Sequence, residues 1–179
     1  LKEGDWVIQS AANSGVGHYV VQLVKARGIN TACVVRRDSA APELLAAGAT
    51  EVFVDGPDLA REVRKRTGAK MKLALDAVAG ETFGRLAETL EDGGTLVNYG
   101  AMSMQNAQVA AGPLIFRDIR VRGFWLVHWF ARASRAERMG VYADLTRAVA
   151  TGALHVPIDR HFALDDVREA VAYTMKGGR

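Results

Sequence analysis

Short apolar runs alternate with longer stretches of helical periodicity along all 179 residues of the chain. The predicted strands are residues 6–10, 31–36, 51–54, 72–77, 95–99 and 119–126. The predicted helices are residues 15–27, 42–47, 58–67, 81–91, 114–116 (one turn at most), 135–151 and 166–175. Strands that alternate with helices pair in parallel through right-handed crossovers. The alternation therefore predicts one α/β domain, a doubly wound Rossmann-type parallel sheet of about six strands with helices on both faces.

Several predicted helices carry a cap, a stop signal or an apolar side. Ser134 and Glu137 form a capping box before helix 135–151, Gly28 follows the first helix, and Gly93 and Gly94 should stop the fourth. The apolar sides, at helical spacing, are Val16, Val20, Leu23 and Val24 in the first helix, Phe83, Leu86 and Leu90 in the fourth, and Met139, Tyr142, Leu145 and Val149 in helix 135–151.

Composition excludes several classes of protein. The net charge is only +3 and the basic residues are scattered, so we expect no nucleic-acid partner. No apolar run reaches the length of a membrane span, so we expect no membrane partner. Cys33 is the only cysteine, which rules out a disulfide within the chain and a multi-cysteine zinc site, and favours a reducing, cytoplasmic location. Both ends of the chain, "LKEGDWVI" and "MKGGR", look like cuts within a longer protein.

The turn after the first strand has the layout of a nucleotide cradle. In the segment "QSAANSGVG", the three glycine slots of G-x-G-x-x-G hold Ala12, Ser14 and Gly17, with an extra glycine at Gly15. Small residues let a phosphate approach the free N–H groups at the start of the next helix, where Asn13 and Ser14 add side-chain donors. The alternative is an ordinary tight turn without a ligand, because a glycine turn alone is weak evidence.

The second strand ends in Arg36, Arg37 and Asp38, about 20 residues after the glycine turn. At this point in dinucleotide-binding folds an acid accepts from the ribose of NAD, whereas an arginine accommodates the 2′-phosphate of NADP. Arg36 comes first and Asp38 can cap the next helix, so we favour NADP(H) over NAD(H). The alternative is a solvated pair of loop charges.

The last two strand tips offer surfaces rather than a catalytic group. Gly100, Ala101 and Met102 follow the fifth strand and are small enough to border a cofactor ring. The sixth ends in an aromatic cluster that fits an interface or an inter-domain core. We predict no catalytic residue and no metal site, and we regard His18, Tyr19, Tyr99 and His128 as structural.

Taken together, four motifs resemble the cofactor-binding domain of medium-chain dehydrogenases/reductases. They are "GDWVIQSAANSGVG", "VVRRD", "GGTLVNYGAM" and "LIFRDIRVRGFWL", in the right order from Gly4 to Leu126. The resemblance is strongest to the 2-enoyl thioester reductases, which reduce enoyl-CoA or enoyl-ACP, and to their quinone-reductase-like relatives. That family uses N-S-G-V-G in the turn and needs no G-x-G-x-x-G.

The resemblance implies a set of cofactor contacts. Asn13, Ser14, Gly15, Val16 and Gly17 would form the pyrophosphate turn; Arg36, Arg37 and Asp38 would surround the 2′-phosphate; Tyr99, Gly100, Ala101 and Met102 would border the nicotinamide ribose; and Phe124, Trp125 and Leu126 would hold the nicotinamide. The family commonly has glycine where this chain has Ala101, a small change, and nothing carries over to His128.

The resemblance also implies parts outside this chain. The family's catalytic tyrosine lies in an N-terminal GroES-like domain, and a last C-terminal strand would follow Arg179, so residues 1–179 would be the NADP-binding Rossmann domain alone. The implied reaction is zinc-independent hydride transfer from NADPH to the β-carbon of an enoyl thioester, with the isolated fragment inactive. The family dimerises through the sixth strand, here from Ile119 to Leu126, and a eukaryotic protein would lie in the mitochondrial matrix.

Other functions remain open at this point. A quinone or enone reductase of the same superfamily would use the same cofactor half, because the other domain builds most of the substrate pocket. A catalytically silent NADP-binding module is the alternative outside the enzymes. Zinc alcohol dehydrogenase fits the motifs less well, and an S-adenosylmethionine-dependent methyltransferase usually places an acid where Arg36 stands.

Overall fold

The computed structural model describes residues 1–176 and contains one six-stranded sheet in which all the strands are parallel. The strands are β1 (Trp6–Gln9), β2 (Asn30–Val35), β3 (Glu51–Val54), β4 (Met71–Asp76), β5 (Leu90–Asn98) and β6 (Arg120–Gly123). Their order, β3-β2-β1-β4-β5-β6, reverses direction between β1 and β4. The predicted doubly wound parallel sheet is therefore confirmed, and its ligand-binding crevice belongs beside the carboxyl ends of β1 and β4.

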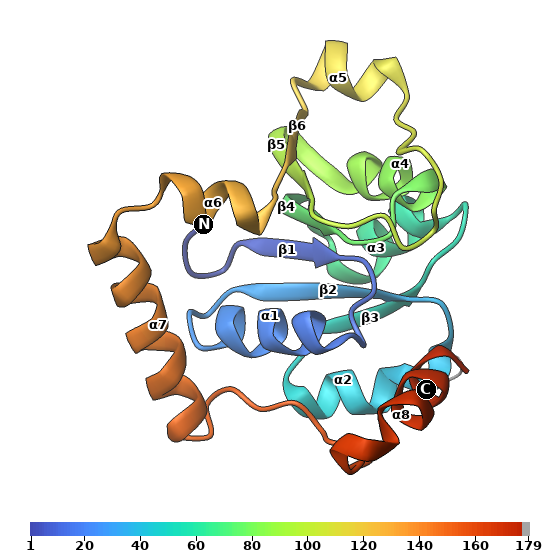
Figure 1. Ribbon diagram of the computed structural model, residues 1–179. Helices are drawn as coiled ribbons and strands as arrows, with labels where there is room; N and C mark the ends of the chain where they lie inside the picture. Colours follow the sequence, from blue (N-terminus) through green and yellow to red (C-terminus); the bar gives the residue numbers. More distant parts are fainter. Residues whose placement is uncertain (177–179) are drawn as a thin grey trace.

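Helices cover both faces of this sheet (Figure 1), as predicted. They are α1 (Gly15–Lys25), α2 (Ala41–Ala47), α3 (Leu59–Thr67), α4 (Gly80–Thr89), α5 (Ala111–Arg117), α6 (Leu126–Arg132), α7 (Arg135–Ala150) and α8 (Val167–Met175). The pair α1 and α2 packs on one face and the pair α3 and α4 on the other. The glycine-rich end, which looked like a cut, lies outside the described residues.

Two apolar clusters hold these layers together. The larger joins the sheet to α3 and α4 through residues such as Ile8, Phe53 and Leu86, and the smaller joins it to α1 and α2 through Val21 and Leu44. The predicted apolar side of the fourth helix is confirmed for Phe83 and Leu86, which are buried in α4. Leu90 is also buried but is the first residue of β5.

The predicted apolar side of α1 is wrong in part. Val16 is exposed, whereas Gly17, His18, Val21 and Gln22 are the buried residues of this helix. Gln22 turns inward because its amide pairs with the backbone of His155 in both directions, at 2.8 and 2.9 Å. These two hydrogen bonds fasten the segment after α7 to the domain.

Several predicted boundaries are also wrong, including the start of β5 at Leu90 and the extent of α5, which is longer than the single turn predicted. The fourth helix ends at Thr89 rather than Glu91, and β5 runs straight through Gly93 and Gly94, where its register with β4 shifts. The sixth strand stops at Gly123, and Leu126 starts α6, which periodicity did not predict. A short apolar, aromatic run fits both a buried strand and a short helix, so its sequence pattern did not distinguish the two.

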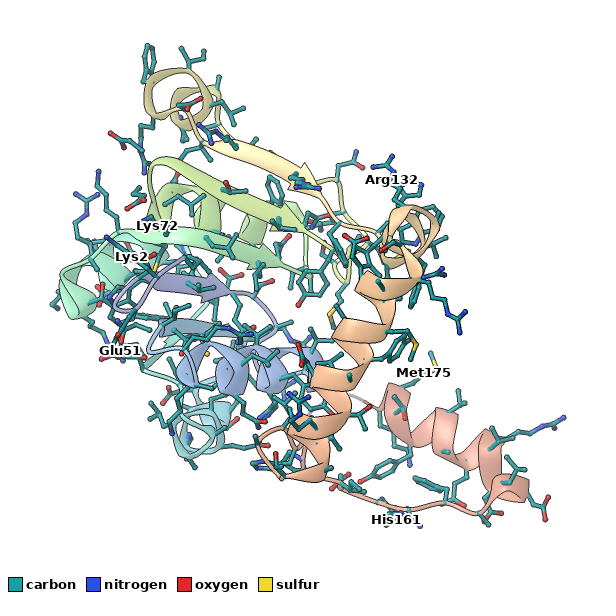
Figure 2. All side chains as sticks on the ribbon, turned by 90° about the vertical axis from the view of Figure 1, so that its left-hand side faces the viewer. Lys2, Glu51, Lys72, Arg132, His161 and Met175 are labelled. Carbon is teal, nitrogen blue, oxygen red and sulfur yellow. The ribbon has the colours of Figure 1, made fainter. Side chains whose placement is uncertain are left out.

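Helix α7 begins at the predicted capping box, since Ser134 and Glu137 cap each other's backbone N–H groups. Its predicted apolar side is not buried: Met139, Tyr142 and Leu145 are all exposed. Figure 1 shows α7 standing apart from the sheet, and Figure 2 labels Arg132 at the end of α6 and Met175 at the end of α8. None of the helices within residues 1–176 is long and apolar enough to cross a membrane.

Cys33 provides a test of how tightly β2 is buried. Burial raises the pKa of its thiol from 9.0 to about 11, against hydrogen bonds from Gln9 and Thr31 that lower it. We expect a disulfide reagent at pH 8 to modify Cys33 at least about 100-fold more slowly in the folded protein than in urea, because two pKa units remove that much thiolate. Since the unfolded thiol ionises first, stability should fall as the pH rises from 9 to 11. Equal rates in the folded and unfolded protein would contradict the burial of β2.

Candidate functional site

A cavity of about 750 Å³ lies where the strands end, beside the reversal of strand order. Its lining residues come from the tips of five strands and from α8: Ser10, Ala11, Asn13, Ser14, Gly15, Val34, Val35, Arg36, Asp55, Val78, Thr82, Met102, Ser103 and Thr174. A second cavity of about 230 Å³ shares Asn13, Val35 and Arg36 with it. Its other lining residues are Arg37, Ser39, Ala40 and Glu43. Cavities of this size at a switch point accommodate small molecules or cofactors.

The glycine turn forms one wall of both cavities. Ser14 caps α1, because its backbone is extended and its Oγ accepts a hydrogen bond of 3.1 Å from the N–H of Gly17. The N–H groups of Gly15 and Val16 belong to the first turn of the helix and have no intrahelical partner. A Cβ on Gly17 would lie 2.2 Å from the carbonyl oxygen of Ala12, so only glycine permits this close approach of helix and turn. The turn thus presents free N–H donors and a helix dipole to an anion.

The tip of β2 supplies positive charge. Arg36 lines both cavities and Arg37 lines the smaller one, and no acidic side chain among residues 1–176 forms an ion pair with either. Asp38, in contrast, starts the 3₁₀ turn before α2 and lines neither cavity. Glu43 is the acidic residue that lines the smaller cavity, and its Oε1 lies 3.3 Å from Nε2 of the buried His18. Two arginines, both exposed, and one acid thus line the smaller cavity, which gives its lining a net positive charge.

Asp76, at the end of β4, ties three strand tips together. Its side chain is fully buried and accepts from Oγ of Ser10 (2.7 Å) on the β1 side and from the Nδ2 of Asn98 (2.9 Å) on β5. It also accepts from the N–H groups of Val78 and Ala79, which start the loop that lines the cavity. Ala79 has a positive φ of 64° that the Asp76 hydrogen bond helps to hold. Asp76 thereby fixes the shape of the cavity floor.

The structure brings together only some of the predicted site residues. Asn13, Ser14, Gly15, Arg36 and Met102 line the larger cavity. Those that line neither cavity are Val16, Gly17, Asp38, Tyr99, Gly100, Ala101, Phe124, Trp125 and Leu126. Phe124, Trp125 and Leu126 are exposed beyond the end of β6.

Tyr99 and Gly100 lie next to the Asp76 network without lining the cavity. The Tyr99 hydroxyl is shielded from solvent and has no hydrogen-bond partner among the described residues. Burial, with a smaller contribution from the Asp76 carboxylate, raises its pKa. A Cβ on Gly100 would lie 2.8 Å from the carbonyl oxygen of Ala77, so glycine permits the close approach of the segments after β4 and β5.

Several cavity residues were not predicted from the sequence. Ser10, Val35 and Asp55 stand at the ends of β1, β2 and β3, and their position at a strand tip was the signal that could have identified them. Thr174 comes from α8, whose approach to the sheet no local pattern encodes.

The chain is similar in sequence to known dehydrogenases and reductases. A family model of zinc-binding dehydrogenases matches residues 15–142, which is most of the chain. The chain belongs to this family, within the medium-chain dehydrogenases/reductases, as the sequence motifs predicted. The mitochondrial enoyl-[acyl-carrier-protein] reductase of Caenorhabditis elegans is 41% identical over 157 residues, which cover 85% of this chain and 45% of that protein.

Solved structures show the same architecture. The Etr1p/NADP/crotonyl-CoA complex, Etr1p being a mitochondrial 2-enoyl thioester reductase of Candida tropicalis, has a TM-score of 0.86 and 24% identity, covering 99% of this chain and 53% of that one. Escherichia coli quinone oxidoreductase complexed with NADPH has a TM-score of 0.78 and 26% identity, covering 88% of this chain and 49% of that one. The chain spans about half the length of the curated relatives it matches.

Zinc, which the family description names, has no evident place in this half. Residues 1–176 contain no group of three or more His, Cys, Asp or Glu side chains that could hold a metal ion.

Proposed function

We propose that this chain is the NADP(H)-binding portion of a zinc-independent oxidoreductase that reduces the C=C bond of an enoyl thioester. The observation that carries the proposal is a pair of adjacent cavities with three shared lining residues. They lie between the free N–H groups of the glycine turn and Arg36, which has no acidic partner among the described residues. An adenine dinucleotide phosphate has the matching sequence of charges, a pyrophosphate followed by a 2′-phosphate. Escherichia coli quinone oxidoreductase, 26% identical, carries NADPH on the same fold.

The residues of the turn would hold the pyrophosphate. The N–H groups of Gly15 and Val16 point out of the first turn of α1, and Asn13 adds a side chain that lines both cavities. Arg36 and Arg37 would bind the 2′-phosphate, since a guanidinium presents a fork of donors to phosphate oxygens. The remaining predicted contacts, Asp38 and the stretches Tyr99–Met102 and Phe124–Leu126, stay part of this proposal through the family resemblance.

Bound NADPH would supply a hydride to the β-carbon of the enoyl thioester. Of this chain's own residues, Asp76 fixes the strand tips on which the cofactor rests, and Ser10, which lines the cavity, is one of its donors. The proton that completes the reduction is expected from the GroES-like domain outside these 179 residues. The enoyl-[acyl-carrier-protein] reductase of Caenorhabditis elegans, at 41% identity, supports this substrate class.

Quinone or enone reduction is the second candidate. The 26% identity to Escherichia coli quinone oxidoreductase favours it, and the cavity described here holds the cofactor rather than the substrate in either case. The intact protein separates the two: NADPH oxidation followed at 340 nm should be supported by crotonyl-CoA and not by a benzoquinone. Oxidation with the quinone alone would favour the second candidate, and tight NADPH binding without either reaction would favour a silent NADP-binding module.

We propose a homodimer formed through β6, the edge strand of the sheet. All four β6 residues are exposed, and Val121 with Phe124 and Trp125 beyond it form an exposed apolar patch at this edge. The strand at the predicted interface is shorter than expected: it was predicted from Ile119 to Leu126, and β6 covers only Arg120–Gly123. A sedimentation velocity run of the intact protein should show a dimer that Val121→Asp converts to a monomer. A wild-type monomer would contradict the proposal.

A reducing compartment fits the single buried thiol of Cys33. The Caenorhabditis elegans relative is named as mitochondrial. We propose the cytoplasm for this protein, or the mitochondrial matrix if its source is eukaryotic.

Removing the Arg36 guanidinium should abolish the preference for NADPH. Arg36 lines both cavities without an acidic partner among the described residues, so a 2′-phosphate would be its ligand. We expect Arg36→Ala to weaken NADPH binding about 10- to 100-fold, the value of one charge-assisted contact, and to leave NADH binding nearly unchanged. Titrations monitored by tryptophan fluorescence measure both constants.

Arg64→Ala provides the matched control for this titration, because Arg64 is exposed on α3 and lines neither cavity. It should bind both cofactors like the wild type. Equal loss of NADPH and NADH affinity in Arg36→Ala would remove the assignment of the 2′-phosphate to this residue.

A further inference from the structure

Gln9 places a polar side chain in the interior of the sheet. It is the last residue of β1, is fully buried, and pairs with Cys33 in the register of β1 and β2. Its Nε2 donates to the carbonyl oxygen of Gly17 in α1 at 3.0 Å and lies 3.5 Å from Sγ of Cys33. Its Oε1 accepts no hydrogen bond from residues 1–176. A buried amide with an unpaired oxygen costs folding free energy.

The backbone of α1 does not need the Gln9 amide to satisfy its hydrogen bonds. In an α-helix the carbonyl of residue 17 already accepts the N–H of residue 21, so without the amide no backbone group is left unpaired. Methionine has a similar length and volume and would fill the same space without an unpaired oxygen. The bond from Gln9 to Gly17 therefore has its main consequence elsewhere than in the stability of the fold.

The Gln9 amide begins a chain of hydrogen bonds that ends at the glycine turn. The carbonyl of Gly17 shares a peptide group with the N–H of His18, which donates to the carbonyl of Ser14 at 2.9 Å. The carbonyl of Ser14 in turn shares a peptide group with the N–H of Gly15, which has no intrahelical partner. Hydrogen bonds in such a chain polarise one another, by roughly 10–30% per bond. The Gln9 amide thus makes the free N–H of Gly15 a stronger donor.

We propose that Gln9 is a positioning residue of the cofactor site, which orients and polarises the N–H of Gly15 for the pyrophosphate. The proposal rests on the proposed function, since it presumes a dinucleotide in the larger cavity. Gly15 lines this cavity, whereas Gln9 does not and acts only through the first turn of α1. NADPH and NADH share the pyrophosphate, so Gln9 supports both cofactors equally, in contrast to Arg36.

The test is Gln9→Met in the intact protein. Both dissociation constants, for NADPH and for NADH, should rise by the same factor of about 3 to 10, the value of one buried hydrogen bond. The midpoint of urea unfolding without cofactor should equal or exceed that of the wild type, because the unpaired oxygen is removed. Weaker binding in a protein of undiminished stability is a combination that a purely structural side chain would not produce.

Thr31→Val is the matched control, because Thr31 is also a buried polar residue of the sheet. Its hydroxyl accepts the N–H of Thr50 at 3.1 Å near the start of β2, at the opposite end of that strand from Arg36. Thr31 lines neither cavity. The substitution leaves the N–H of Thr50 without this acceptor, so it should lower the urea midpoint and leave both dissociation constants unchanged.

Three results with Gln9→Met would overturn the inference and leave the proposed function in place. They are wild-type affinity for both cofactors, a loss confined to NADPH, and a urea midpoint below that of the wild type. The wild type gives a test that needs no variant: the side-chain amide protons of Gln9 should exchange slowly with solvent, and rapid exchange would contradict the bond to Gly17. Failure of the wild type to bind either dinucleotide would overturn the proposed function and this inference with it.

Discussion

Gly17→Ala should destabilise the protein by about 3 kcal/mol and prevent cofactor binding, because the added methyl group collides with backbone rather than with a movable side chain. The new Cβ would lie 2.2 Å from the carbonyl oxygen of Ala12 and 2.6 Å from its carbonyl carbon. Relief requires α1 to move away from the turn, which would also break the hydrogen bond from the N–H of Gly17 to Ser14. Urea unfolding followed by circular dichroism measures the loss.

Gly15→Ala separates the packing effect from the effect on the cofactor. A Cβ on Gly15 meets nothing within 4 Å, and the residue lies at the start of α1, where alanine is the better helix former. Its unfolding free energy should equal or slightly exceed that of the wild type, while its affinity for NADPH should fall because the methyl group projects from the phosphate turn. A Gly17→Ala protein as stable as Gly15→Ala would contradict the described approach of α1 to the turn.

Asp76→Ala should cost about 4 kcal/mol of folding free energy, the largest effect expected for any single side chain here. The substitution leaves three donors without their acceptor, namely the Ser10 hydroxyl and the N–H groups of Val78 and Ala79. The Asn98 amide loses one acceptor and keeps the carbonyl of Gly100 at 2.8 Å. It also releases the Ala79 backbone from its positive φ, so the loop that lines the cavity should change shape. Thermal and urea unfolding measure the loss of folding free energy, and NADPH titration measures how the changed loop affects cofactor binding.

Asp144→Ala is the control for this variant. Asp144 is an exposed residue of α7 whose only recorded partner within residues 1–176 is Arg147, at 3.4 Å. Such a surface pair contributes less than about 1 kcal/mol. Similar unfolding free energies for Asp76→Ala and Asp144→Ala would show that Asp76 does not organise the strand tips.

The fold was largely predictable because its signals are local. The run Glu51–Val54 forms β3 with the predicted ends, and the Ser134–Glu137 box starts α7 where it should. The errors arise where two local signals conflict. Gly93 and Gly94 predicted a stop but lie within β5, at a register shift that accommodates them, and the aromatic run after Gly123 turned into α6.

The site was predictable only where one residue carries its own chemistry. Arg36 at a strand tip and Ser14 at a helix cap could be identified from sequence position. Asp55 could not, because its position in the cavity wall depends on hydrogen bonds with Thr82 and Arg85 of α4, which are 27 and 30 residues away along the chain. The four hydrogen bonds of Asp76 likewise come from three separate strand tips.

The central claim, that the two adjacent cavities form an NADP(H) site, is tested most directly by a crystal structure of the intact protein with bound NADP⁺. We expect the pyrophosphate at the N–H groups of Gly15 and Val16 and the 2′-phosphate within hydrogen-bonding distance of Arg36 or Arg37. A cofactor bound elsewhere on the molecule, or cavities still empty at saturating NADP⁺, would contradict the account.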